Sequence, residues 1–345
     1  SQIITLEFTA TDNERASNLD TVNITIPART PISFTMNALN DTGLTHGLNY
    51  PSGQNFDCTG YIANYQDCYH GRDATHNDSS DGAHGFSFTK IGMYGDVLAA
   101  DADGWSCIRD NVTGLVWEYK RDGTTRAPGT LYLRDNVDYH LDRLNSTELC
   151  GINDWRLPSL QDAISIFHYS QPDPSSLSYF DEDYFNGGMY PFWILEGDKY
   201  FNVNGNGYVN TYPGDKWMVL GVHKPGVNNS KLGPVSYYSN DFIVDEKTAK
   251  DSRTGLEWTR CSNQQLVTNG VCVSINETYS WKDTIELVET LNATTGFAGY
   301  FDWRLPNTKE LYTILTGSST KWSIRINSDV FPLTSTDGAI PTSTF

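Results

Sequence analysis

An internal duplication constrains the fold of this chain more than any other feature of its sequence. After Arg109 the chain reads Asp-Asn-Val-Thr-Gly-Leu-Val-Trp, and after Lys250 it reads Asp-Ser-Arg-Thr-Gly-Leu-Glu-Trp. The pentapeptide Asp-Trp-Arg-Leu-Pro follows each stretch, first from Asp154 and again from Asp302. Two motifs that recur in the same order indicate two homologous modules, so the chain is expected to fold as a tandem repeat.

Both copies predict the same local elements. The Asp-x-x-Thr-Gly segment is a turn signal, and it leads into a short strand that ends in a buried Trp. A helix is expected before the pentapeptide in each copy, with a weaker apolar stripe in the first copy at Val137, Leu141 and Leu144, and a further helix is expected directly after each pentapeptide. Three of these helices start with an N-cap residue and an acidic residue three positions later: Ser280 with Asp283, Ser159 with Asp162, and Asn307 with Glu310.

These motifs resemble the C-terminal domain family of the Legionella collagen-like protein, whose members carry D-x-x-T-G-L-x-W and D-W-R-L-P-T/S. The resemblance covers roughly residues 105–224 and 249–345. The Arg-Leu-Pro before a capped helix is also similar to the core of formylglycine-generating enzymes. Both resemblances imply an α+β fold made of tandem C-type-lectin-like modules. Family members continue with two further strands, for which 192–194 and 216–223 are candidates in the first copy.

The start of the chain predicts a separate element. Two alternating β-branched runs, residues 3–12 and 21–26, flank a polar turn and predict a β-hairpin. This hairpin resembles the last two strands of an immunoglobulin-like or cadherin-like repeat. We therefore expect a strand segment over 1–26, a first lectin-like module with an N-terminal extension over 27–245, and a second, truncated module over 246–345.

The charge of the chain limits its partners. Twenty-four Lys and Arg residues stand against 42 Asp and Glu residues, which gives a formal net charge of -18. Because like charges repel, nucleic acid and anionic bilayers are disfavoured as partners. No apolar stretch approaches the roughly 18 to 20 residues that span a bilayer, so no direct membrane insertion is expected.

The six cysteines predict three disulfides between sequence neighbours. Neither a Cys-x-x-Cys motif nor a close pair of histidines occurs, which removes the usual signals of thiol redox chemistry and zinc binding. Disulfides imply an oxidising compartment and an extracellular or cell-surface location. The alternative is six buried free thiols in a cytosolic protein. The predicted pairs are Cys58 with Cys68, Cys107 with Cys150, and Cys261 with Cys272.

One aromatic-rich run is the candidate ligand-binding surface. Aromatic faces rimmed by amides can hold sugars or apolar side chains without an acid or base catalyst. The alternative is that half of these aromatics form the module core. Nearby, Gln171-Pro172-Asp173 matches a galactose signature of calcium-dependent lectins but also reads as an ordinary helix stop. The candidate residues are Tyr190, Trp193, Asn204, Asn206, Tyr208, Tyr212 and Asp215.

Calcium is the one metal that the sequence leaves open. Asp73, Asp78 and Asp81 lie in a Gly-containing loop, and Asp101 and Asp103 lie in a second acidic loop. Calcium takes six to eight oxygen ligands, which such loops can supply. The spacing differs from that of the twelve-residue calcium loop, and solvated surface turns are the competing interpretation. No other cofactor is expected.

The repeated Trp-Arg pairs are interpreted as architecture. Trp155 with Arg156 and Trp303 with Arg304 occupy the same place in both copies, which favours a buried Trp and an Arg held by a carboxylate or by carbonyls. A carbohydrate platform is the alternative.

No catalytic signature accompanies these motifs. The sequence has no Gly-x-Ser-x-Gly, no P-loop and no His-Glu-x-x-His, and only a pair such as Glu118 with Asp154 leaves a glycosidase open. We therefore expect a non-enzymatic bacterial adhesin that binds glycans or extracellular matrix. The alternative is a structural subunit of an extracellular filament or pilus-like appendage, in which strand edges pair with sibling subunits.

Overall fold

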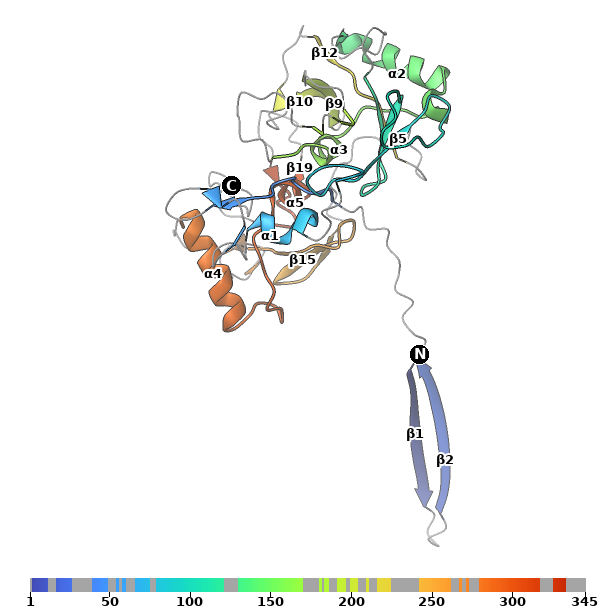
Figure 1. The fold of residues 1–345 in the computed structure, drawn as a ribbon. Coiled ribbons are helices and arrows are strands. Elements are labelled where there is room, and N and C mark those ends of the chain that lie inside the picture. The colour runs from blue at the N-terminus through green and yellow to red at the C-terminus, as the bar shows by residue number, and fades with distance from the viewer. Residues whose placement is uncertain are drawn as a thin grey trace. The chain divides into compact units, whose positions relative to one another are not determined.

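The computed structural model of the protein is an α+β structure with several small sheets and few helices (Figure 1). The chain divides into two units, residues 1–37 and 38–345. None of the described helices is long and apolar enough to cross a membrane. The structure describes residues 2–11, 17–26, 39–48, 54–55, 58–59, 66–74, 79–120, 130–169, 180–181, 183–185, 191–196, 199–203, 209–210, 216–224, 242–261, 267–268, 271–272, 279–316 and 325–332.

The first unit contains the predicted hairpin. Strands β1 (Gln2–Thr11) and β2 (Ser17–Ile26) pair antiparallel, with Gln2 opposite Ile26 and Thr11 opposite Ser17. The two alternating β-branched runs thus lie within the two strands.

The first module contains two sheets. The four-stranded sheet has the order β13-β7-β6-β5 and is antiparallel throughout; its strands are β5 (Phe88–Ile91), β6 (Cys107–Asp110), β7 (Val116–Glu118) and β13 (Val222–His223). The five-stranded sheet has the order β11-β10-β9-β12-β8, and only β9 and β12 are parallel. Its strands are β8 (Leu131–Leu133), β9 (Phe192–Glu196), β10 (Lys199–Val203), β11 (Val209–Asn210) and β12 (Lys216–Met218).

Two helices complete the first module, and a short N-terminal extension precedes it. The helices are α2 (Val137–Ser146) and α3 (Leu160–Ser165), with the 3-10 turns η3 (Arg134–Asn136) and η4 (Leu149–Gly151) beside them. The main core holds large apolar side chains from both sheets and from α3, among them Phe88, Ile108, Trp117, Ile164, Phe192 and Ile194. The extension contains β3 (Gly47–Leu48), β4 (Gln54–Asn55), α1 (Asp67–His70) and η2 (Arg72–Ala74).

The second module repeats the central part of the first. The sheet β14-β15-β16 corresponds to β5-β6-β7, α4 corresponds to α2, and α5 corresponds to α3. Because β14 pairs antiparallel with β15, residues 242–244 belong to the sheet of this module. Its elements are β14 (Phe242–Val244), β15 (Thr248–Asp251), β16 (Glu257–Thr259), β17 (Val267–Thr268), β18 (Val271–Cys272), α4 (Trp281–Ala293), α5 (Thr308–Tyr312), β19 (Leu315–Thr316) and β20 (Arg325–Ile326).

The repeated turn has the same geometry in both modules. The buried Asp110 carboxylate accepts hydrogen bonds from the backbone of Val112, and the buried Asp251 carboxylate accepts one from the backbone of Arg253. In the first copy the turn ends at Gly114 with φ +74°, and the second copy has the equivalent glycine at φ +73°. A side chain is strained in this left-handed conformation, so the motif requires glycine there.

The two repeated tryptophans make equivalent backbone hydrogen bonds. The backbone of Trp155 exchanges two hydrogen bonds with the Asn145 amide, at 2.6 and 3.1 Å, and its indole N–H donates to the Leu149 carbonyl. Trp303 makes the same pair of bonds with Asn292, at 2.6 and 3.0 Å. Trp155 is buried, whereas Trp303 is half-buried.

The repeated arginines fasten each pentapeptide to the helix that follows it. Arg156 donates to the Asp162 carboxylate at 2.8 Å, and Arg304 donates to the Glu310 carboxylate at 2.7 Å. Both acidic residues complete capping boxes, as does Asp283 in α4, so the three predicted helix starts are confirmed. The Trp-Arg pairs are therefore architectural.

Three disulfides join sequence neighbours in the structure. They are the predicted pairs Cys58–Cys68, Cys107–Cys150 and Cys261–Cys272.

The difference in burial between the two tryptophans predicts unequal stability losses. We expect Trp155→Ala to lower the free energy of unfolding by about 3 to 5 kcal/mol, because it removes a buried ring and leaves a cavity. Trp303→Ala is expected to cost less, since its half-buried ring loses fewer contacts. Denaturant unfolding of both full-length variants measures the difference; equal losses would contradict it.

Candidate functional site

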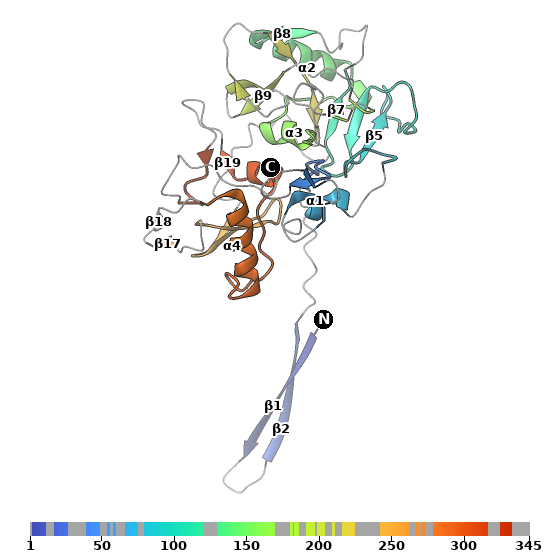
Figure 2. The ribbon, with the colours of Figure 1, turned by 60° about the vertical axis from the view of Figure 1, so that its left-hand side comes forward.

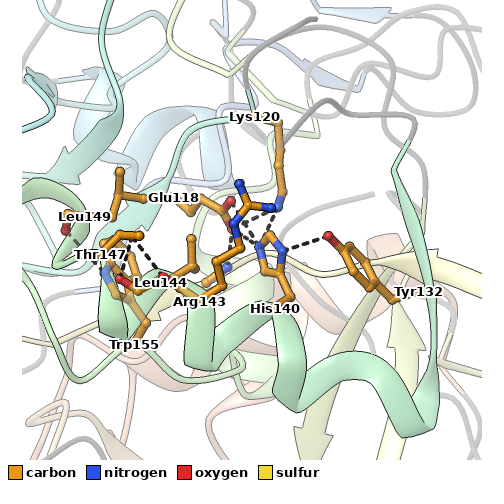
Figure 3. Close-up of polar contacts among 10 residues, drawn as sticks. Glu118, Lys120, Tyr132, His140, Arg143, Leu144, Thr147, Leu149 and Trp155 are labelled. Carbon is orange, nitrogen blue, oxygen red and sulfur yellow. Dashed lines mark hydrogen bonds and ion pairs between the residues drawn. The ribbon is translucent and has the colours of Figure 1, made fainter. Parts of the chain in front are cut away.

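A group of buried polar side chains in contact with one another lies in the first module (Figure 3). The Glu118 carboxylate accepts a hydrogen bond from the Lys120 ammonium at 2.8 Å and lies 3.0 Å from Nε2 of His140. Nδ1 of His140 lies 3.0 Å from the Tyr132 hydroxyl on the other side of the ring. These four residues are called the ionic cluster below.

The Glu118 carboxylate is surrounded by nitrogen atoms. Nε2 of His140 lies 3.0 Å from this carboxylate and 3.2 Å from the Lys120 ammonium. Burial alone would raise the pKa of Glu118, but the charges of Lys120 and His140 outweigh burial and lower that pKa to about 2. The carboxylate therefore stays ionised beside its cation.

The ionic cluster is a stabilising feature of the first module alone. Glu118 has no exposed surface, and Lys120 and His140 are 7% and 2% exposed, which leaves no room for a substrate. The corresponding positions of the second module hold Thr259, Cys261 and Leu287. The carboxylate of Asp154 pairs instead with His223 at 2.7 Å, so the two carboxylates considered as a glycosidase couple have different partners.

A glycine allows the chain to close over Glu118. The backbone N–H of Gly221 donates to the Glu118 carboxylate at 3.1 Å, and the Gly221 carbonyl accepts from the backbone of Glu118. A Cβ at this position would lie 2.7 Å from Leu144 and 3.1 Å from Trp155. A side chain at this position would displace Leu144 and crowd Trp155, which favours glycine.

A second group of buried charges joins the two modules. The Lys309 ammonium, on α5, donates to the carbonyls of Asp41 and Ser165, the latter at 2.9 Å. In return, Gln161 on α3 donates to the carbonyl of Tyr312 at 3.1 Å. The side chain of the second residue of each helix thus donates to the carbonyl of the last residue of the other helix. Such reciprocal contacts are typical of a two-fold interface. Helices α3 and α5 are neighbours in both ribbon views (Figures 1 and 2).

Carboxylates surround the Lys309 ammonium at this junction. Burial lowers the pKa of Lys309 to about 7, although the charges of Asp41, Asp110 and Asp67 act in the opposite direction. Burial raises the pKa of Asp67 to about 6, against the hydrogen bond that it accepts from Thr42. Burial also raises the pKa of Asp110, which accepts a bond from an asparagine of the N-terminal extension. The junction is ionisable and closed to solvent.

An insertion distinguishes the surfaces of the two modules. Residues 92–106 connect β5 to β6, whereas residues 245–247 connect the equivalent strands β14 and β15. We call residues 92–106 the insertion loop. It carries exposed apolar side chains: Tyr94 is 87% exposed, Val97 63% and Met93 52%. Because the second module folds with a tight turn at this place, the fold does not need the loop.

The insertion loop is fixed to the module at separate points. The backbone N–H of Cys150 donates to the Met93 carbonyl at 2.9 Å, and Gly95, with φ +92°, packs against the carbonyl of Cys150. The buried Lys90 ammonium lies 3.9 Å from the centre of the Trp105 ring, at the far end of the loop. These contacts fix the backbone of the loop on either side of Tyr94, whose side chain is exposed.

Trp193 does not lie where the sequence predicts. Its side chain is 3% exposed, packs with Leu157 and Val219, and donates its indole N–H to the Tyr132 carbonyl at 2.9 Å. It is a core residue because β9 is an inner strand of its sheet. The other predicted ligand-binding residues lie outside the described residues: Tyr190, Asn204, Asn206, Tyr208, Tyr212 and Asp215.

The predicted calcium residues are only partly described. Asp73 lies in η2, Asp78 is outside the described residues, and the Asp81 carboxylate accepts from the Ser87 hydroxyl at 2.5 Å. Among the described residues no three potential ligand side chains come together to hold a metal. Gln171-Pro172-Asp173 is also outside the described residues. Calcium binding by the Asp trio stays a prediction.

Comparison with protein families identifies the repeated modules. The family described as Lcl C-terminal domain matches residues 106–216 and 247–345, more than half of the chain. The chain belongs to this family. The two matched ranges contain the two copies of the duplicated motifs, while most of the insertion loop precedes the first range. No curated protein and no solved structure gives a significant match.

The ionic cluster predicts a large effect of neutralising Glu118. We expect Glu118→Gln to lower the free energy of unfolding by about 3 to 5 kcal/mol, because Lys120 is then buried without a counter-charge. The surface variant Glu286→Gln, which breaks a pair on α4, is the control and should cost below about 0.5 kcal/mol. Glu118→Gln combined with Lys120→Met should recover part of the loss; no recovery would contradict the pairing.

The junction predicts a rise of stability with pH. Lys309 has its pKa lowered from 10.5 to about 7 in the folded state, so the unfolded state binds more protons between these pH values. The free energy of unfolding should therefore rise by up to about 1.4 kcal/mol per pH unit above pH 7. Lys309→Met should lose this rise, and the exposed-lysine variant Lys250→Met should keep it. Parallel curves for all three proteins would contradict the assignment.

Proposed function

We propose that this protein is a non-enzymatic bacterial adhesin, secreted or held at the cell surface, that binds glycans or extracellular matrix. Its two modules are proposed to be C-type-lectin-like, and its N-terminal hairpin to derive from an immunoglobulin-like repeat. The observation that carries the proposal is the insertion loop, which is hydrogen-bonded to the module through its backbone and presents a solvent-exposed aromatic side chain on a scaffold that folds without it. Large exposed apolar side chains grouped at one place mark interaction sites.

Three further observations support this proposal. The family membership fits a surface protein, and the three disulfides fit an oxidising extracellular location. In the described part of the chain, the ionic cluster and the two Arg-carboxylate pairs have structural partners. A binding protein needs no activated acid, base or nucleophile, and these buried groups are committed to packing.

The hairpin favours a second candidate, a structural subunit of a filament or pilus-like appendage. Within the described residues, β1 and β2 pair only with each other. A two-stranded ribbon offers two edges to which a sibling subunit can add a strand. Size-exclusion chromatography and electron microscopy of the full chain separate the two functions: filaments support the second candidate, and discrete particles contradict it.

Adhesion predicts that Tyr94 contributes to binding and not to folding. We expect Tyr94→Ala to weaken binding to a surface ligand by about fivefold or more, because an exposed aromatic anchor is lost, while the melting temperature changes little. Tyr139→Ala, which removes a 68% exposed ring on α2, is the control and should bind normally. The measurement is binding of the full chain to immobilised polysaccharides, matrix proteins and whole cells.

Two outcomes of this measurement would contradict adhesion. The first is that the wild-type chain binds no member of the panel. The second is that Tyr94→Ala and Tyr139→Ala bind as well as the wild type, which would remove the insertion loop from the binding surface.

A further inference from the structure

The tip of the insertion loop is a preorganised surface. We define it as Met93, Tyr94, Asp96 and Val97. The backbone N–H of Gly92, next to the tip, donates to the Asp96 carbonyl at 2.8 Å. Val97 forms an antiparallel β-bridge with Ile91, the last residue of β5. Because the backbone is already ordered, a partner that contacts Tyr94 orders little additional chain on binding.

Its disulfide anchor fixes this tip to the four-stranded sheet. The carbonyl of Met93 accepts from the backbone of Cys150, whose sulfur is bonded to Cys107 at the start of β6. A second contact at the other end of the loop is the indole N–H of Trp105, which donates to the Tyr184 carbonyl at 3.1 Å. The tip is therefore held between two fixed ends.

The chemistry of the loop indicates the charge of its partner. No Lys, Arg or His occurs in residues 92–106. The exposed charges of the loop are all negative, and an exposed glutamate lies beside its anchor at Cys150. The whole chain has a net charge of -18, so electrostatic repulsion disfavours binding of sulfated glycans, nucleic acid and anionic bilayers. The acidic residues are Asp96, Asp101, Asp103 and Glu148.

We propose that the tip of the insertion loop binds a basic segment of a partner protein, with an Arg or Lys side chain over Tyr94. The methylene groups of such a side chain pack on Tyr94, Met93 and Val97, and its cation lies over the ring and next to Asp96. This ligand uses both the exposed apolar surface and the negative charge. The inference rests on the proposed adhesive function and names its ligand as a basic protein.

The experiment measures binding of the full chain to three probes. They are a fluorescent peptide that alternates Arg with Leu, an uncharged polysaccharide and a sulfated polysaccharide. We expect the peptide to bind, the sulfated polysaccharide not to bind, and peptide affinity to fall as salt is added. Tyr94→Ala and Asp96→Asn should each weaken peptide binding by about fivefold or more without changing the melting temperature.

Matched controls separate a local site from general charge attraction. Glu246→Gln removes one charge from the equivalent turn of the second module, and Tyr139→Ala removes an exposed ring elsewhere. Both should bind the peptide within about twofold of the wild type. If Glu246→Gln weakens binding as much as Asp96→Asn does, the attraction is non-specific and the inference is overturned.

The remaining outcomes distinguish the ligand class from adhesion itself. Tyr94-dependent binding of a polysaccharide without binding of the peptide overturns the basic ligand but leaves the proposed function standing. If neither these probes nor the cells and matrix proteins of the earlier panel bind, both proposals fail.

Discussion

A buried ammonium group determines how the two modules meet. Lys309 lies inside unit 38–345, and a charge removed from water must be matched by oxygen atoms. The N-terminal extension supplies the Asp41 carbonyl, and α3 supplies the Ser165 carbonyl. The extension, the first module and the second module therefore pack together around one amino group, and displacing the extension or the first module would remove one of its two carbonyl partners.

Helices α3 and α5 pack the two modules against each other through equivalent residues. Gln161 and Lys309 are equivalent positions, and each donates to the end of the other helix. Because Gln is neutral and Lys is charged, only one side of this pseudo-two-fold contact needs carboxylates. On that side the charges of Asp41, Asp110 and Asp67 act on Lys309, and these residues belong to the extension and the first module.

The motifs were predictable from sequence because their contacts are local. Asp162 caps α3 three residues after Ser159, and Arg156 reaches the same carboxylate from only six residues away. Two of the three disulfides join cysteines 10 and 11 residues apart, and the third joins Cys107 to Cys150, the next cysteine along the chain. The resemblance to the family was sufficient to identify the modules, because the motifs that define it are these same local contacts.

Long-range burial could not be predicted in the same way. Lysine on a helix is normally solvated, and nothing near Lys309 in the sequence indicates that residues of the extension cover it. Trp193 looked like a ligand-binding aromatic because its strand lies in an aromatic-rich run, but that strand is central in its sheet. The buried state of His140 also depends on Glu118, which lies on a different element.

Positions that are equivalent in the two modules belong to the scaffold, whereas the insertion loop of the first module belongs to its surface. Positions that agree, such as Trp155 and Trp303, make the same backbone bonds and specify the fold. The insertion loop has no counterpart of similar length in the second module, yet it is fastened by a disulfide-bonded cysteine and by Lys90. Ordering such a loop costs conformational entropy that folding of the scaffold does not require. Its exposed Tyr94 lies on an anchored backbone and is consistent with a role in contacting other molecules, since little further backbone is ordered when a partner covers it.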